Sequence, residues 1–207
     1  MRIWSEKQIQ SYVTEQLEKK YNEKFTFIRN ANGFYNKPIR NFYFFSDSFQ
    51  DAMIYVELDI KERIVSDNYV IFQKRNEICG YVKENISTVF PQNDVYQSIM
   101  DSVIPSEYCM DTPVEMMTED PRTGLNLFVF AVDDGRNADE KIESLRKQLK
   151  RANIKGKVRI CFVSSDSNIY IKNDMECSGF YSEYKGYKCT FLLDDDYNFV
   201  YVEWGNR

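Results

Sequence analysis

Histidine is absent from the 207-residue sequence. Without an imidazole the chain cannot build a Ser–His–Asp or Cys–His nucleophile system, nor a zinc site with histidine ligands. General acid–base chemistry near neutral pH also loses its commonest side chain, so carboxylates, lysine or tyrosine would have to replace it. We therefore expect no catalytic residue, no cofactor and no metal site.

Glycine and long apolar runs are also scarce. The eight glycines fit neither a phosphate-binding loop nor a dinucleotide fingerprint, so nucleotide binding by the usual routes is not expected. No stretch approaches the roughly 18 apolar residues of a membrane span. The opening MRIWSEKQIQ lacks the apolar core of a signal peptide. We expect a cytoplasmic protein, or an extracytoplasmic one if a leader was removed.

Cysteine is present in an odd number without tight spacing, which argues against a disulfide framework. The five are Cys79, Cys109, Cys161, Cys177 and Cys189. Reduced thiols in a cytosol fit this pattern best. A bridge between Cys177 and Cys189 across a hairpin stays open as an alternative.

Aromatic residues are abundant, with 15 Tyr and 15 Phe, and they favour strands and a well-filled core. Ser5 and Gln8 form a capping-box pattern that predicts the start of a first helix. Apolar residues at helical spacing predict a second helix over 74 to 89. Between the two helices, strand-like runs occur at FTFI (25–28), NFYFF (41–45), AMIYVELDI (52–60) and NYVIFQ (68–73).

The second half of the chain also alternates between the two kinds of structure. LNLFVFAV (125–132) is apolar on both faces and predicts a central strand. A third helix begins near Asn137, and the strand KVRICFV (157–163) follows it. The C-terminus is typical of a meander, with strands at NIYIK (168–172), YKCTFLL (187–193) and FVYVEW (199–204).

These elements predict an α+β fold, mainly antiparallel sheet with about three helices packed against it. Residues 1–90 form a helix plus antiparallel strands, and 91–124 form an acidic, Pro-containing connection. Residues 125–207 form a strand–helix–strand unit followed by the meander. The three parts could equally form one continuous domain.

Two acidic runs are typical of turns. Asp194–Asp196 with Asn198 resembles the opening of a calcium loop, but Phe199 and Gly205 occupy the positions where an EF-hand needs glycine and glutamate. We interpret this run as a solvated hairpin turn. Asp133–Asp134 is likewise interpreted as a turn that places negative charge before the third helix.

One basic cluster could suggest nucleic acid: Arg146, Lys147, Lys150, Arg151, Lys155 and Lys157. Cations near a helix C-terminus also complement its dipole, which explains the cluster without a ligand. The net charge is −5, and no basic domain stands out. Nucleic-acid binding is therefore not expected.

The acidic charge is concentrated in one segment. Residues 91 to 136 hold nine acids and two arginines, a net −7 against −5 for the whole chain. With interleaved tyrosine and methionine, this segment predicts a surface that steers and grips a basic protein partner. A merely solvated loop is the alternative. The candidate partner-binding residues are Asp94, Tyr96, Asp101, Glu107, Tyr108, Asp111, Glu115, Met116, Met117, Glu119 and Asp120.

The stretch EQLEKKYNEKFTFI (15–28) changes from a charged helix to an aromatic strand, and DNY follows at 67–69. With Tyr12, Lys20, Tyr21 and Phe25, this stretch resembles an N-terminal module of uncharacterised Gram-positive bacterial proteins, including small lipoproteins. Their typical line is Tyr-Leu-x-x-Lys-Tyr-x-x-x-Phe. The resemblance covers residues 1 to 90 and implies no catalytic residues. Packing of the helix end onto the first strand explains the same residues physically.

Three functions are compatible with these observations. The first is a non-catalytic protein-binding module, such as an immunity protein or inhibitor that neutralises a partner. The second is a ligand- or peptide-binding domain of a bacterial surface lipoprotein that lacks its leader. The third is an enzyme that uses carboxylates, such as Glu57 and Asp59, or a thiol.

Overall fold

A computed structural model describes residues 4–31, 38–99, 103–165, 171 and 174–205. The fold is α+β, and the described residues contain five α-helices and two sheets. The chain divides into two compact units. The first comprises Met1–Val70 and Asp101–Cys109, and the second comprises Ile71–Met100 and Met110–Arg207. The expected boundary at residue 90 falls inside the second unit, because the chain passes between the two units near residues 70, 100 and 109.

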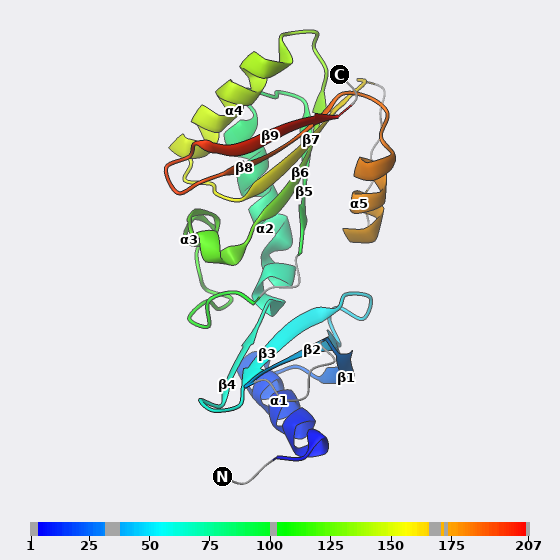
Figure 1. Ribbon diagram of the computed structural model, residues 1–207, viewed down its shortest axis with the longest axis vertical. Coiled ribbons are helices and arrows are strands. Elements are labelled where there is room, and N and C mark those ends of the chain that lie inside the picture. Colours follow the sequence, from blue (N-terminus) through cyan, green and yellow to red (C-terminus); the bar gives the residue numbers. More distant parts are fainter. Residues whose placement is uncertain (1–3, 32–37, 100–102, 166–170, 172–173, 206–207) are drawn as a thin grey trace. The chain divides into compact units, whose positions relative to one another are not determined.

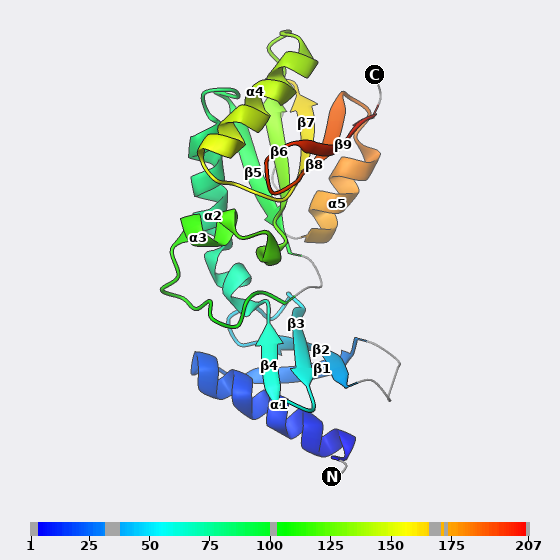
Figure 2. The ribbon, with the colours of Figure 1, turned by 60° about the vertical axis from the view of Figure 1, so that its left-hand side comes forward.

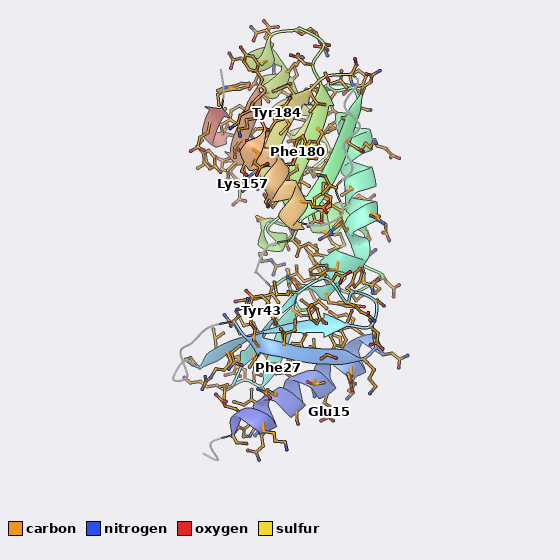
Figure 3. All side chains as sticks on the ribbon, turned by 90° about the vertical axis from the view of Figure 1, so that its right-hand side faces the viewer. Glu15, Phe27, Tyr43, Lys157, Phe180 and Tyr184 are labelled. Atoms are coloured by element: carbon orange, nitrogen blue, oxygen red, sulfur yellow. The ribbon has the colours of Figure 1, made fainter. Side chains whose placement is uncertain are left out.

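The first unit is a helix on a four-stranded antiparallel sheet (Figure 1). Its elements are α1 (Glu6–Tyr21), β1 (Phe25–Asn30), β2 (Ile39–Ser46), β3 (Ile54–Asp59) and β4 (Ile64–Asp67), and the strands pair in that order. The strand expected within residues 52–60 is confirmed as β3, and its alternate residues Ile54, Val56 and Leu58 are fully buried. Figure 3 shows Phe27 and Tyr43 on opposite sides of this sheet.

Helix α1 begins and ends as its sequence requires. The capping box of Ser5 and Gln8 is confirmed, with both reciprocal hydrogen bonds present. Asn22 ends the helix in the left-handed conformation at φ 52°, which asparagine tolerates better than most residues.

A buried cluster around Asp67 joins the end of α1 to the end of β4. The Asp67 carboxylate is fully buried and accepts hydrogen bonds from Lys20 Nζ at 2.9 Å, Tyr21 Oη at 2.6 Å and the Tyr69 backbone N–H at 2.9 Å. The Tyr21 ring packs on Phe25 and Tyr69, with centroids 5.9 and 4.5 Å away. Burial, followed by the charge of Asp67, raises the pKa of Tyr21. The expected packing of the helix end onto the first strand is therefore confirmed.

The second unit is a five-stranded sheet with helices on both faces (Figures 1 and 2). Its strands are β5 (Asn93–Ser98), β6 (Asn126–Val132), β7 (Lys157–Val163), β8 (Lys188–Leu193) and β9 (Phe199–Gly205), in that spatial order. Only β6 and β7 are parallel among the pairs of this sheet that the structure describes. As predicted, β6 is an interior strand buried on both faces.

Three longer helices cover this sheet. In both ribbon views α2 (Tyr69–Ile86) and α4 (Ala138–Arg151) lie on one side and α5 (Asp174–Glu183) on the other. The predicted start of the third helix is confirmed, because the Asn137 side chain accepts the Asp139 N–H at 2.9 Å as the N-cap of α4. Short turns α3 (Val114–Glu119) and η1 (Pro121–Thr123) precede β6.

Several sequence-based boundaries were wrong. NYVIFQ is not a strand, because Tyr69 opens α2 and the strand is the preceding β4. The Asp67 carboxylate accepts the Tyr69 N–H at the first residue of the helix. The consecutive residues Val70–Phe72 are all buried, whereas a strand with one exposed face would bury only alternate residues. The second helix thus begins five residues before position 74.

The other corrections concern irregular-looking sequence. The segment 91–124 is not one long connection, because it contains β5, α3 and η1. Helix α5 occupies part of the region read as a meander, although β8 and β9 form the expected hairpin. Most of NIYIK (168–172) lies outside the described residues.

All five cysteines are free, which leaves Cys177 and Cys189 as separate buried thiols. Among the residues that the structure describes, no helix has the length and apolar character needed to span a bilayer.

Replacing Asp67 by Ala tests the buried cluster. We expect the free energy of unfolding of the first unit to fall by about 2–4 kcal/mol, because Tyr21 Oη and the Tyr69 N–H lose their acceptor. Trp4 and Trp204 are the two tryptophans, so a Trp204→Phe background lets urea unfolding of the first unit be followed by the fluorescence of Trp4. Asp47→Ala, at an exposed position, is the control. Equal stability of the two variants to within about 0.5 kcal/mol would contradict this role.

Candidate functional site

The acidic run at 194–198 and the basic residues near the end of α4, which both resembled ligand-binding motifs, contact each other. The turn Asp194–Asn198 between β8 and β9 lies against the basic end of α4. Arg146 donates to the Tyr197 carbonyl at 3.0 Å, and Lys155 Nζ lies 3.8 Å from the Asp195 carboxylate. The acidic run and three residues of the basic cluster, Arg146, Lys150 and Lys155, are therefore partners in one structural contact.

The Asp194 side chain stabilises this turn through hydrogen bonds to its backbone. Its carboxylate accepts the N–H groups of Asp196 at 2.9 Å and Asn198 at 2.8 Å. Hydrogen bonding, first of all from the Asn198 backbone, holds the pKa of Asp194 below its usual range. The interpretation as a hairpin turn is confirmed. Across the described ranges, no group of three or more potential ligand side chains is placed to hold a metal ion.

A second acidic run surrounds a buried lysine. Asp133 and Asp134 follow β6, and both form ion pairs with Lys141, whose side chain is only 3% exposed. Arg136 adds a second cation, with its guanidinium 2.6 Å from Asp134. The hydrogen bond from Arg136, followed by that from Lys141, holds the pKa of Asp134 well below its usual range.

This cluster lies where an α/β unit forms a crevice. Helix α4 leaves β6 over one face of the sheet, and α5 follows β7 on the other, so the chain diverges at the carboxyl ends of the parallel pair (Figure 2). A hollow of about 240 Å³ opens there. It is lined by Asp133, Gly135, Arg136, Ala138, Phe162 and Tyr187.

The sequence pattern did not identify this cluster as a site, because it placed Asp133 and Asp134 in a solvated turn. One signal was available. Lys141 lies on the same helical stripe as Ile142, Leu145 and Leu149, which are the buried residues of α4. A lysine within an apolar stripe needs a buried counter-charge, and the two aspartates supply it.

The predicted partner-binding residues are divided between the two units, and some of them are buried. Asp101 lies outside the described residues, and Glu107 and Tyr108 belong to the first unit, whereas the others belong to the second. Tyr108 and Met117 are buried, at 6% and 0% exposure.

Three more of these residues have internal partners. Asp94 pairs with Lys83 at 2.8 Å. The Tyr96 hydroxyl accepts from Arg75 at 2.9 Å. Asp120 accepts the Arg122 N–H at 2.8 Å and forms an ion pair with its guanidinium. These contacts hold β5 and the turn after α3 in place.

The remaining predicted residues lie on α3 or just before it. We define the α3 surface as Met110, Asp111, Glu115, Met116 and Glu119, all of which are exposed. Met116 is 54% and Met110 43% exposed. Within the described part of the chain, none of the three carboxylates of this surface takes part in an ion pair.

The buried side of α3 fixes this surface in place. Val114, Met117 and Thr118 point into the second unit. The Thr123 hydroxyl donates to the Met117 carbonyl at 2.8 Å, and the Lys155 N–H donates to the Thr118 carbonyl at 2.9 Å. Glu115, Met116 and Glu119 therefore lie on a short helix anchored at its end, and Met110 and Asp111 lie in the turn before it.

The carboxylates considered for an enzyme have a local role. Asp59 accepts the N–H groups of Lys61 at 2.8 Å and Glu62 at 3.1 Å, which forms the turn from β3 to β4. Glu57 lies on the same face of β3, two residues before it.

No family model matches the chain, and no curated protein matches its sequence. The crystal structure of a DUF5037 family protein from Ruminococcus gnavus is similar to it, with a TM-score of 0.40 and 13% sequence identity. That match covers 93% of this chain and 94% of the other.

Replacing Lys141 by Met tests the charge cluster. The folded pKa of Asp134 lies below its unfolded value of about 3.9, so its stabilising contribution is present above that pH and is lost as the pH falls through the folded pKa. Without the lysine we expect the carboxyl pKa of Asp134 to move up toward its ordinary value, measured by ¹³C NMR titration. Lys147→Met, at an exposed position of the same helix, is the control. An unchanged Asp134 pKa in the Lys141 variant would contradict the assignment.

Proposed function

We propose that the protein is a non-catalytic protein-binding module, of the immunity or inhibitor type that neutralises a partner. Its partner is a protein with a basic surface, and the α3 surface is where that partner binds. The observation that carries the proposal is a set of exposed carboxylates that form no ion pair within the described residues, next in sequence to two exposed methionines.

The charges of the second unit support this choice of surface. The acids at Asp133, Asp134 and Asp195 have cations of the same unit beside them. Glu115 and Glu119 do not, so their field extends into solvent and can attract a basic partner before contact.

The methionines supply the contact itself. Met110 and Met116 carry flexible, polarizable side chains that can adapt to an apolar partner surface. Acidic side chains around them would select a partner that combines apolar and basic residues, and would raise the rate of association at low salt.

Charge reversal at α3 tests the proposal. The variant Glu115→Lys/Glu119→Lys should lose a partner that wild-type protein captures from the source cells. With both proteins purified, wild-type association should slow as salt rises, and the variant should associate at least about tenfold more slowly. Stopped-flow fluorescence measures both rates.

A matched control carries the same change of charge elsewhere. Glu62→Lys/Glu183→Lys alters two exposed positions that are not part of the α3 surface and should keep the partner. If both variants lose the partner equally, or if neither does, the α3 surface is not the binding site.

The hollow beside Asp133 favours a second candidate function, binding of a small ligand. Its lining combines a carboxylate, the Arg136 guanidinium and the rings of Phe162 and Tyr187. Such a set suits a small zwitterion, for example a free amino acid, whose amine and carboxylate would meet opposite charges.

NMR titration with the free amino acids tests this second candidate. We expect shift changes confined to the hollow, which weaken in Tyr187→Ala but not in Val200→Ala, an exposed change on β9. No shift with any amino acid at about 10 mM, which would saturate a site with a millimolar Kd, would rule it out.

A further inference from the structure

The face of the second sheet that carries α5 is only partly covered. Directly paired residues on neighbouring strands point to the same side, so the register defines which side chains share this face. Two cross-strand rows run over it: Ser98, Asn126, Lys157, Leu192 and Tyr201 in one, and Tyr96, Phe128, Arg159, Thr190 and Glu203 in the other.

Helix α5 covers one part of this face. Phe180, Tyr181 and Tyr184 pack against a core that includes Phe130 and Cys161. Beyond the helix, β7, β8 and β9 leave Lys157, Arg159, Leu192 and Tyr201 half-buried. Figure 3 shows Lys157 on the α5 side of the sheet.

The two cations of this open part lack carboxylate partners. Arg159 donates to the Asn126 side-chain oxygen and lies over the Phe128 ring, 4.9 Å from its centroid. Lys157 Nζ lies 5.9 Å from the centroid of the Tyr201 ring. Neither forms an ion pair within the residues that the structure describes. The Arg159 guanidinium is thus held in place with donors to spare.

These contacts distinguish the face from the basic end of α4. There, Arg146 and Lys155 are occupied by the β8–β9 turn. Lys157 and Arg159 are two residues apart on one strand, so they point the same way at a spacing of about 7 Å. The sequence-based expectation against nucleic acid counted Lys157 in the cluster at the end of α4 and did not include Arg159.

We propose that this open sheet face binds single-stranded nucleic acid, with Lys157 and Arg159 on the phosphates and Tyr201 beneath a base. A sheet face can present cations and a ring to an unpaired strand, whose bases are free to stack. The aromatic ring favours nucleic acid over an acidic peptide, because every base has a face that can stack on it. The segment 91–136, with its net charge of −7, repels a polyanion from its own surface.

Fluorescence anisotropy with labelled oligo(dT) and oligo(U) of about 12 nucleotides tests the proposal at about 50 mM salt. Both should bind, and a duplex of the same length should bind more weakly. In Lys157→Gln/Arg159→Gln the affinity should fall at least about tenfold. The slope of log K against log salt should become shallower by about 1.4, the value for two lost contacts to a single strand.

Three comparisons separate this site from general attraction of a polyanion. Lys7→Gln/Lys147→Gln removes the same charge from exposed positions on α1 and α4 and should bind like wild type. Tyr201→Ala should weaken binding about tenfold, while Tyr201→Phe should not. Circular dichroism of each variant should match that of the wild type. If Tyr201→Ala unfolds, Tyr201→Phe still tests whether binding needs the aromatic ring and not the hydroxyl group.

Several results would overturn the proposal. They are no binding of either oligonucleotide at low salt, equal loss in the Lys7/Lys147 control, or equal affinity for the duplex. Competition by polyglutamate at equal charge would assign the face to an acidic protein segment instead, and would also overturn it.

Discussion

The parallel pair β6 and β7 sets the constraint on which the second unit depends. Leu127, Val129 and Ile160 are buried on one side of it, and Phe128 and Cys161 on the other. A strand pair buried over most of both faces has little room for charge, so ionisable side chains lie mainly at its ends, on the covering helices and on the outer strands. Arg159, half-buried within β7, is the exception. Charges that pair within the unit stabilise the fold, whereas charges without such a partner can bind another molecule.

Two groups of charges are satisfied internally. Lys141 is buried between Asp133 and Asp134 at the carboxyl end of β6. The basic end of α4 holds the acidic turn between β8 and β9. In each case the carboxylates order backbone by accepting N–H groups as well as by pairing, so these charges stabilise the fold and leave little net field. Two other groups, the α3 acids and the cations of β7, have no such partner in the described residues, and they carry the two proposals.

Much of the fold followed from local sequence. The capping box of Ser5 and Gln8, the alternation of β3 and the two-sided apolar run of β6 each have one physical solution, and the structure has it. The misplaced start of α2 had a different cause, because Asp67, which accepts the Tyr69 N–H at the start of α2, is also held by Lys20 and Tyr21 of α1. That contact joins residues 46 positions apart, and no local pattern records it.

The candidate sites were harder to predict than the elements. Residues 91–124 were grouped by charge, yet the chain distributes them over two units, and Tyr108 and Met117 are buried. Composition records how many acids a segment has, whereas the fold decides which of them meet cations. The rows on the α5 face likewise depend on the register of five strands, which brings Lys157 beside Tyr201 although they are 44 residues apart.

Zero-length carbodiimide cross-linking in the source cells, read by mass spectrometry, tests most directly whether unpaired carboxylates mark the binding surface. This chemistry joins a carboxylate to a lysine in direct contact. The account predicts intermolecular links from Asp111, Glu115 or Glu119 to lysines of one partner protein, and only intramolecular links from Asp133 and Asp195. Intermolecular links that arise from Asp133 or Asp195 and spare the three α3 acids would contradict it.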